Sequence, residues 1–320
     1  MGRYLVTRLA WSVLIIVASS MVVFLILRVL PSDPVLARLG ATTGVDPGVI
    51  ERLRREAGLD APIVTQYLTW VGGVLRGNLG ASYASQLPVS GIIAERIPVT
   101  LELTALAMIL TVVVSVPLTI AAVYRRRSPA DHAVGLLTSL GISVPLFVVS
   151  LVLILVFASV LGWLPSRGYV PFSQDPAKNL RLMILPVVAL TFVAAPLLIR
   201  HMRESMLETE DEAFVRTATG KGARRPRVLF GHILRASMVP SLTMLGLLIG
   251  YTLAGTVVVE YIFGLPGLGS LALESALKRD YAVLQSVGLL IVFMFVLTTF
   301  IVDVINGLVD PRVRLGADRA

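Results

Sequence analysis

Hydrophobic residues in this chain gather in runs that are long enough to cross a lipid bilayer. A helix rises about 1.5 Å per residue and the hydrocarbon core is about 30 Å thick, so a crossing needs roughly 20 apolar residues. The pattern therefore predicts an all-α membrane protein with six transmembrane helices. The six stretches are Leu9–Leu30, Pro98–Tyr124, Val134–Leu161, Leu182–Ile199, Met238–Glu260 and Leu284–Val309.

The first stretch has two interpretations, a cleaved signal peptide or a retained anchor. It is longer than the apolar core of a signal peptide, and Leu30-Pro31-Ser32-Asp33 is a poor cleavage site. We therefore interpret it as a retained membrane anchor.

Basic residues in the short loops predict the orientation, because loops rich in Lys and Arg stay on the cytoplasmic side. Such residues precede the first stretch, follow the second and the sixth, and gather between the fourth and the fifth, where residues 200–235 hold eight. With six crossings these positions share one side, so we expect both termini to be cytoplasmic. Residues 31–97 balance six Arg against six acidic residues and are expected outside.

The stretches divide the chain into parts. We expect residues 1–30 to form the N-terminal cytoplasmic end with the first transmembrane helix, and residues 31–97 to form a small extracytoplasmic helical region. Residues 98–309 form the core with helices two to six, including a cytoplasmic loop at 200–237, and residues 310–320 form a cytoplasmic tail. In the outer region, Asp46-Pro47 favours a helix start, Gly58 favours its end, and Leu59–Leu75 predicts a second helix.

Composition supports the membrane class. The chain is 56% hydrophobic and only 15% charged, whereas soluble domains contain about 25% charged residues. The net charge of +8 suits contact with anionic lipid headgroups and is weak evidence for nucleic acid, which we do not expect as a partner. The absence of cysteine excludes disulfides, thiolate metal sites and cysteine nucleophiles.

The polar segment between the fourth and fifth stretches carries helix signals. Thr209 followed by Glu212 predicts a capping box, and the acidic residues 210–212 suit the first turn of a helix. Gly220 and Gly222 favour the end of that helix, and Arg225-Pro226 can begin another. The predicted contact face of the first helix consists of Ala213, Phe214, Thr217 and Ala218.

This short helix has two interpretations. Its apolar side could lie on the lipid surface, as in many amphipathic helices, or it could dock on a water-soluble partner. Composition alone slightly favours the lipid surface.

Between the fifth and sixth stretches lies the segment Gly264-Leu265-Pro266-Gly267-Leu268-Gly269. Its spacing differs from that of the phosphate-binding G-x-G-x-x-G pattern. The predicted orientation places it outside, and we interpret it as a tight re-entrant turn.

Ionisable residues near the ends of the stretches could snorkel, cap a helix or contact substrate. For Arg28 and Glu102 we favour snorkelling or capping, and Asp303 could pair with a cytoplasmic base. Prolines within or near the stretches could kink helices around a pathway or serve packing. The ionisable residues are Arg28, Glu102, Glu260 and Asp303, and the prolines are Pro117, Pro145, Pro186 and Pro196.

Signatures of catalysis are absent. The chain contains no G-x-x-x-x-G-K-[ST], no H-E-x-x-H and no G-x-S-x-G. Its three histidines, His132, His201 and His232, fall in predicted cytoplasmic segments and receive no metal role. We expect no catalytic residue, no metal site and no cofactor in this chain, and the sequence leaves the substrate-binding residues unassigned.

At the polar loop the sequence resembles a family. Arg216-Thr217-Ala218 followed by Gly222 matches the spacing of the EAA loop of ABC importer permeases, and Arg216 stands in the glutamate position as in the peptide-type branch. Over nearly its whole length, the chain resembles the B-type permease of dipeptide and oligopeptide importers. The other matching segments are Arg3-Tyr4, Arg8-Leu9, Leu30–Pro34, Gly58–Pro62, Gln66-Tyr67, Trp70, Gly77–Ser82, Arg96, Pro98, Thr100, Leu103, Pro240, Glu260–Gly269, Arg279–Tyr281, Val302-Asp303 and Asp310–Arg312.

Four departures from the family pattern leave the substrate branch open. Ser32 stands where glycine is usual, Asn78 replaces a common aspartate, Ala282 replaces a usual proline, and Thr298-Thr299 occupies a usual asparagine region.

The resemblance implies the type I ABC importer permease fold and a role as one permease subunit of an ATP-driven importer, most simply for di- or oligopeptides. It makes the helix around residues 209–222 the element that couples to an ATPase. It implies a homologous second permease, two ATPase subunits or a fused pair carrying ATP and Mg, an extracytoplasmic substrate-binding protein, and a lipid environment in a bacterial or archaeal plasma (inner) membrane. Gly264, Pro266, Gly267 and Gly269 would then form an outer gate or receptor contact.

Other functions stay open. Nickel and glutathione importers share the permease pattern, although the absence of Cys and of His in the stretches mildly favours peptide. An ion-coupled secondary transporter would need carboxylates at mid-membrane and an inverted repeat, and neither stands out. An intramembrane enzyme would need a nucleophile and a base at membrane depth.

Overall fold

The computed structural model consists of helices joined by turns and loops. The helices follow the apolar runs of the sequence, and several of them begin at a proline. The structure describes residues 2–29, 47–56 and 60–309, and no strand occurs within these ranges. Two helix starts have the expected capping geometry: the Ser128 side chain accepts a hydrogen bond from Asp131 N–H, and the Asp175 side chain accepts one from Lys178 N–H. In both, proline occupies the first helical position, where its fixed φ suits the helix and its missing N–H costs nothing.

The helices are α1 (Gly2–Val29), α3 (Pro47–Glu56), α4 (Ile63–Leu75), α5 (Val89–Tyr124), α6 (Pro129–Ser143), α7 (Leu146–Leu153) with the π-helical segment η1 (Ile154–Val160), α8 (Pro176–Glu210), α9 (Ala213–Gly220), α10 (Arg225–Val228) with the π-helical segment η2 (Leu229–Ile233), α11 (Leu234–Phe263), α12 (Leu268–Leu277) and α13 (Tyr281–Val309).

Five described helices are long and apolar enough to cross a membrane: α1, α5, α8, the continuous α10–α11 segment and α13. The predicted stretch Val134–Leu161 is helical but not continuous, and it is kinked at Pro145, which is one of the roles that the sequence left open for this proline. This stretch is split between α6 and the α7–η1 pair, which are bent by 103°. Pro145 causes the break: a residue before proline is driven out of the helical region, and Val144 is extended with φ −92° and ψ 124°.

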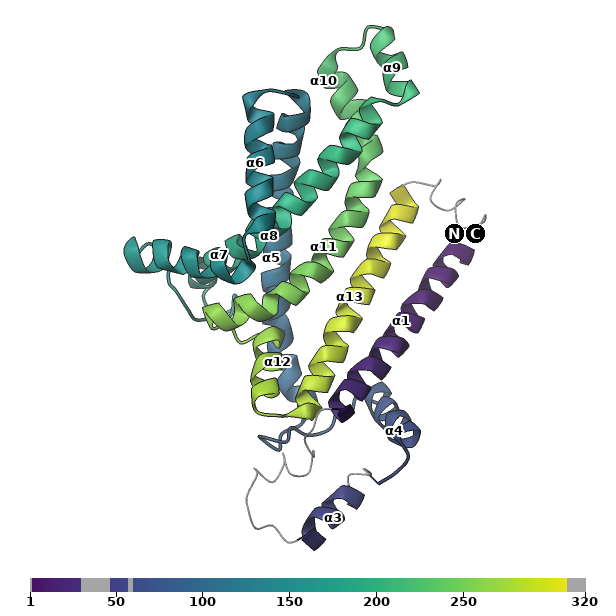
Figure 1. Cartoon of the computed structure of the whole chain (residues 1–320), viewed down its shortest axis with the longest axis vertical. Coiled ribbons are helices and arrows are strands. Elements are labelled where there is room, and N and C mark those ends of the chain that lie inside the picture. The colour runs from purple at the N-terminus through teal and green to yellow at the C-terminus, as the bar shows by residue number, and fades with distance from the viewer. Residues whose placement is uncertain (1, 30–46, 57–59, 310–320) are drawn as a thin grey trace.

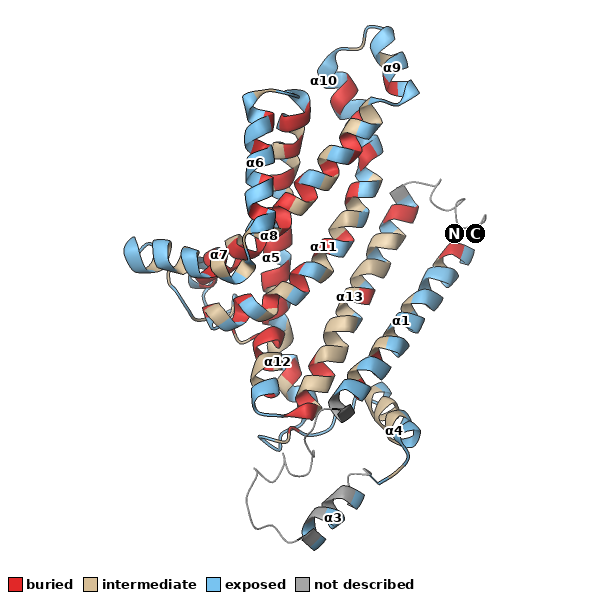
Figure 2. Cartoon of the chain, viewed as in Figure 1, coloured by how far each residue is buried: buried red, intermediate tan, exposed pale blue. Residues whose placement is uncertain are grey.

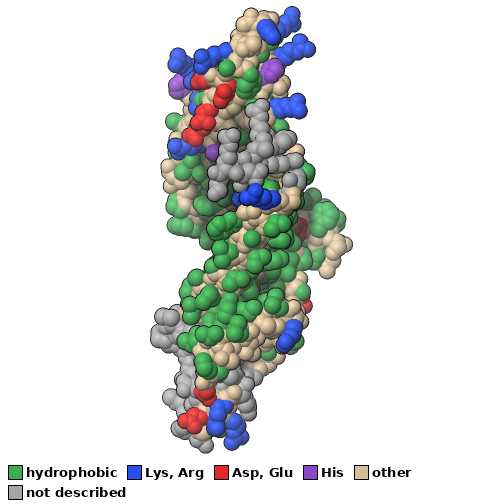
Figure 3. Space-filling model, turned by 90° about the vertical axis from the view of Figure 1, so that its right-hand side faces the viewer, with side chains coloured by type: hydrophobic (Ala, Val, Ile, Leu, Met, Phe, Trp, Pro, Cys, Tyr) green, Lys and Arg blue, Asp and Glu red, His purple; other side chains and the backbone are tan. Residues whose placement is uncertain are grey.

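The long helices run side by side, with α8 at the centre (Figure 1). Within the most apolar window of each helix, 78% of α8 is buried but only 11% of α1, so α1 lies at the periphery (Figure 2). The start of α1 and the end of α13 lie toward the end of the molecule that carries α9 and α10, and α3 and α4 lie at the opposite end. Hydrophobic side chains cover the middle of the face in Figure 3, while Lys and Arg gather at its two ends, as expected of a membrane protein.

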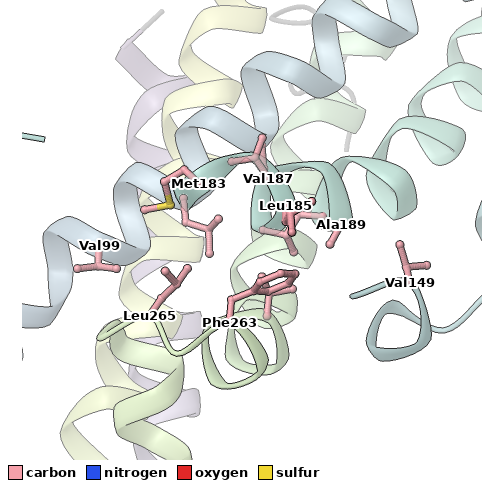
Figure 4. Close-up of a cluster of buried hydrophobic side chains, with 12 residues drawn as sticks. Val99, Val149, Met183, Leu185, Val187, Ala189, Phe263 and Leu265 are labelled. Atoms are coloured by element: carbon pink, nitrogen blue, oxygen red, sulfur yellow. The ribbon is translucent and has the colours of Figure 1, made fainter. Parts of the chain in front are cut away.

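The main core cluster joins helices that are far apart in sequence. Val99 of α5, Val149 of α7, Met183 and Leu185 of α8 and Phe263 of α11 pack together (Figure 4). Because apolar side chains gain little from leaving lipid, close packing rather than burial must hold such helices together.

Glycines allow two of these close contacts. A Cβ added to Gly141 of α6 would lie 2.4 Å from Pro196 Cγ and 2.9 Å from Phe192 O of α8. A Cβ at Gly250 of α11 would lie 2.0 Å from the Phe295 ring of α13. Gly246 and Gly250 form a G-x-x-x-G spacing, which is typical of tight helix pairs in membranes.

The peripheral helix α1 is attached at both ends. Near one end, Arg8 pairs with Asp303 of α13 at 3.2 Å, and the Tyr4 hydroxyl donates to the Asp303 carbonyl. Near the other end, Phe24 packs against the Tyr67 and Trp70 rings of α4. The predicted helix at Leu59–Leu75 thus exists but begins at Ile63, because Pro62 precedes it in an extended conformation. The predicted stop at Gly58, the cap at Asp46 and the tail 310–320 lie outside the described residues.

Candidate functional site

The polar end of the molecule contains α9, the short helix that the sequence predicts. It spans Ala213–Gly220 and sits at the tip beyond the long helices (Figure 1). The predicted stop is confirmed: α9 ends at Gly220, and Gly222 has φ +80°, a left-handed conformation that glycine adopts without strain. The second predicted helix start is also confirmed, since α10 begins at Arg225 with Pro226 in its first turn.

The predicted capping box of Thr209 and Glu212 is wrong. Thr209 lies inside α8, which continues to Glu210, and its hydroxyl donates to the Ser205 carbonyl at 2.8 Å. Glu212 is itself the N-cap of α9, and its side chain makes no capping bond. The extra turn of α8 is stabilised by packing: Met202 and Met206 are buried in a cluster with Val215 of α9.

Arg216 fixes the angle between α8 and α9. Its Nε and Nη2 atoms both donate to the Asp211 carbonyl, at 3.1 and 2.7 Å. The guanidinium thus binds the carbonyl of Asp211, the residue that follows α8, with two charge-assisted bonds that fix its plane. A glutamate here could not donate these bonds, which gives a physical reason for arginine at this position.

Burial separates the two faces of α9. Val215 points into the protein and is buried, whereas Ala213, Phe214 and Thr217 of the predicted contact face are exposed and Ala218 is half-buried. The Phe214 side chain is 48% exposed at the tip of the molecule, and a large exposed aromatic side chain is typical of an anchor in a protein interface.

A cavity of about 500 Å³ lies beneath α9, between it and the ends of α5, α8 and η2. Its lining is mixed: it contains apolar residues such as Val123, Val215 and Leu229 together with the charged residues Glu210, Arg216 and Arg225. Glu210 lies 3.8 Å from Arg126 and 3.9 Å from Arg225, so its charge is shared between the loop after α5 and the start of α10.

The predicted tight turn between the fifth and sixth stretches is confirmed at the opposite end. Gly264 has φ +65°, and Leu265 N–H donates to the Glu260 carbonyl at 2.8 Å. After this turn the chain forms α12, which begins at Leu268. Glu260, 0% exposed, accepts a hydrogen bond from Ser270 N–H at 3.0 Å and so caps the N-terminus of α12.

A second loop packs against this turn. Arg167 Nη2 donates to the Tyr261 carbonyl and Gly168 N–H donates to the Phe263 carbonyl. The Tyr169 hydroxyl donates to Glu102 of α5 at 2.9 Å. Burial, and then this bond to the carboxylate, raises the pKa of Tyr169 to about 12, so the phenol stays protonated as the donor. Residues 167–169 therefore connect α5 with the C-terminal end of α11.

The ionisable residues of the apolar stretches have structural partners. Glu102 binds Tyr169, Glu260 caps α12, and Asp303 pairs with Arg8, which confirms capping for Glu260 and a basic partner for Asp303. The Arg28 side chain lies outside the described set. Among the described residues, no group of three or more His, Cys, Asp or Glu side chains could hold a metal ion.

Two polar clusters escaped the sequence prediction. Asp131 at the start of α6 forms a two-bond ion pair with Arg203 of α8, at 3.0 and 3.1 Å. Buried Asp280 accepts hydrogen bonds from Ser82 Oγ, Tyr83 N–H and Ala84 N–H. For the Asp280 cluster, the sequence offered one signal: Gly77–Ser82 and Arg279–Tyr281 both match the family pattern. The structure shows that these two segments are in contact.

Comparisons with known proteins agree with this architecture. A family model described as "Binding-protein-dependent transport system inner membrane component" matches residues 115–315, and a model of the N-terminal part of such membrane components matches residues 1–104. A Brucella abortus (strain 2308) protein, named as a peptide transport system permease, is 38% identical over 98% of this chain and 99% of its own length.

Two further similarities concern a glutathione system and a solved structure. The glutathione transport system permease protein GsiC of Escherichia coli O6:H1 is 37% identical, over 98% of this chain and 99% of its own. A chain in a structure of inward-facing conformations of the MetNI methionine ABC transporter superposes with a TM-score of 0.56 at 18% identity, covering 68% of this chain and 96% of that chain. The last similarity confirms the fold of an ABC importer permease.

Proposed function

Because the chain belongs to the family of inner membrane components of binding-protein-dependent transport systems, we propose that it forms half of the translocation pathway of an ATP-driven importer of di- or oligopeptides. The protein is a multi-pass membrane permease, so chemistry on the substrate is not its task. An ion-coupled secondary transporter is not favoured, since the family works with a binding protein.

Peptide is the substrate class that the relatives support. The Brucella relative is named for peptide transport and the Escherichia relative for glutathione, which is itself a tripeptide. We therefore place this chain with peptide substrates and keep glutathione and nickel as the alternatives within the family.

Coupling to an ATPase is assigned to α9. The exposed Phe214 at the tip carries this proposal, because it offers an aromatic side chain to a partner beyond the membrane. Thr209, Glu212, Ala213, Arg216, Thr217, Ala218, Gly220 and Gly222 complete the element. In this scheme the partner ATPase subunits, separate or fused, hold ATP and Mg, and the permease holds neither.

A movement of α9 can reach the membrane core through α8, because α8 is one continuous helix. The 35-residue helix α8 runs from the central core to the turn before α9, and Arg216 holds α9 to that turn. A displacement of α9 by the ATPase is therefore transmitted along α8 to the α5–α8–α11 core, which can move as rigid bodies between inward-open and outward-open states.

This assignment also fixes the sides of the membrane. The end with α9 and both termini faces the cytoplasm of a bacterial or archaeal cell, and the turn with Gly264, Pro266, Gly267 and Gly269 faces outward as a gate or receptor contact. The remaining partners are a homologous second permease and an extracytoplasmic substrate-binding protein.

The test compares two exposed phenylalanines at opposite ends. Phe214→Ala on α9 should reduce ATPase association and binding-protein-dependent peptide uptake in proteoliposomes by about tenfold or more, since interface anchors contribute about 2 kcal/mol or more. Phe172→Ala, in the outer loop at similar exposure, is the matched control and should leave both unchanged. Wild-type association and uptake for Phe214→Ala, or purification of the chain with neither an ATPase nor a second permease, would refute the assignment.

A further inference from the structure

The Glu260 carboxylate lies where three helices meet at the outer end. Thr100 of α5 donates its hydroxyl to Glu260 Oε1 at 2.6 Å and accepts Leu268 N–H of α12 at 2.8 Å. Glu260 Oε2 accepts Ser270 N–H at 3.0 Å. One carboxylate and one hydroxyl thus join α5, α11 and the first turn of α12, and both residues are buried.

The glycines of the turn make room for this carboxylate. A Cβ at Gly267 would lie 2.3–2.4 Å from three atoms of the Glu260 carboxyl group, and a Cβ at Gly269 would lie 2.4 Å from the Val257 backbone. The turn therefore wraps directly around Glu260. The glycines at 267 and 269 are required by these contacts, which leave the turn little freedom to rearrange alone.

Apolar packing joins the same elements. Val89 and Ile93 of α5 form one buried cluster with Leu268 and Leu271 of α12. Swinging the turn away from α5 would expose this cluster and leave the buried carboxylate and Leu268 N–H without partners. In a low-dielectric interior such unpaired groups are costly, so the joined state is strongly favoured.

We propose that Thr100 and Glu260 are positioning residues that unite residues 89–104, 253–263 and 264–277 into one outer gating unit. The outer mouth of the importer then opens by displacement of this unit as a whole, and the glycine-rich turn does not swing as a separate flap. This inference rests on the proposed transport function and deepens the assignment of the turn as a gate.

The first experiment measures distances within the unit. The chain has no cysteine, so Gly91→Cys on α5 and Ala276→Cys on α12, both exposed, can be spin-labelled in the complete transporter. The distance distribution between the labels should be the same without nucleotide and in the ATP-bound trapped state. A shift between the two states would overturn the proposal, because α5 and α12 would then move apart during the cycle.

The second experiment tests the hydroxyl with matched variants. Thr100→Val keeps the shape but removes both hydrogen bonds, whereas Thr100→Ser keeps the hydroxyl. Thr100→Val should broaden the distance distribution and lower the stimulation of ATP hydrolysis by substrate-loaded binding protein about tenfold, while Thr100→Ser behaves as wild type. Glu260→Gln, which leaves one acceptor oxygen for the two donors Thr100 Oγ–H and Ser270 N–H, should act like Thr100→Val.

The outcomes separate this inference from the proposed function. Wild-type uptake and ATP hydrolysis in the same vesicles establish the transporter independently of the variants. If both Thr100→Val and Glu260→Gln keep normal stimulation, or if both fail only in assembly with the partner subunits, the positioning role in gating is refuted while the transport function stands.

Discussion

At the scale of single residues, the structure depends on contacts between small side chains and backbone. Pro196 has no N–H, so α8 lacks one internal hydrogen bond at the Phe192 carbonyl. Gly141 of α6 lies against that carbonyl and the Pro196 ring, at a distance that no larger residue permits. Of the two roles that the sequence left open for Pro196, packing is the one supported by this contact.

We predict that Gly141→Val will lower the stability of the protein by about 1–3 kcal/mol, the usual cost of overpacking a filled interface. Gly135→Val is the matched control on the same helix, because a Cβ there meets nothing within 4 Å. Thermal unfolding of the detergent-purified protein should show a lower midpoint for Gly141→Val alone. Equal midpoints for the two variants would contradict the α6–α8 contact.

Acidic residues near the ends of the apolar stretches mark the limit of sequence reasoning at this scale. The positions of Glu260 and Asp303 near span ends correctly indicated capping or pairing, because a charged group in a membrane must find a partner. The partners themselves, Thr100 and Arg8, are 160 and 295 positions away, and no local pattern links such residues. Their proximity is a product of the tertiary fold.

At the scale of elements, helix existence was predictable and helix geometry was not. Apolar length and glycine stops correctly indicated the long helices and the end of α9. Hydropathy does not give the size of a bend, however: Val134–Leu161 is apolar, and the sequence left open whether Pro145 kinks it, whereas the structure bends it by 103°. The predicted start of the α9 helix failed for a related reason: packing of Met206 extends α8 through Thr209, and tertiary contact overrides a local capping signal.

The contact between α11 and α13 gives a prediction for a helix pair. Gly250→Val should destabilise the protein by about 1–3 kcal/mol, because the new side chain collides with the Phe295 ring. Adding Phe295→Ala should recover part of this loss, since the smaller residue vacates the same space. A double-mutant cycle on thermal or denaturant stability measures the coupling. Strictly additive effects would show that the two positions are not in contact.

At the scale of the whole molecule, the start of α1, the end of α13 and the basic α9 region lie toward one end, and the loop before α5 lies at the other (Figure 1). Charge counts in the sequence predicted this sharing of sides. The arrangement of the helices around α8 could not be predicted from the sequence. Every stretch is similarly apolar, and hydropathy alone does not distinguish the central helix from the peripheral α1.

Single cysteines provide a topology test in this cysteine-free chain. Thr217→Cys on α9 should react with a membrane-impermeant maleimide only when the cytoplasmic side is accessible. Ala84→Cys, exposed in the loop before α5, should react in intact cells. Labelling of both from the same side would contradict the orientation and, with it, the assignment of α9 to an ATPase.

The bend at Pro145 has a mechanical consequence. The segment from α7 through η1 projects sideways from the body (Figure 1) and is about 20 Å long at the rise of a helix. Its first helix, α7, packs against α8 and α11, two helices of the core to which a movement of α9 is transmitted. Because the segment is long, a rotation of about 10° at its root moves its tip by about 4 Å. A small rotation of α8 and α11 would therefore displace the far end of the α7–η1 segment by several ångströms relative to its neighbours.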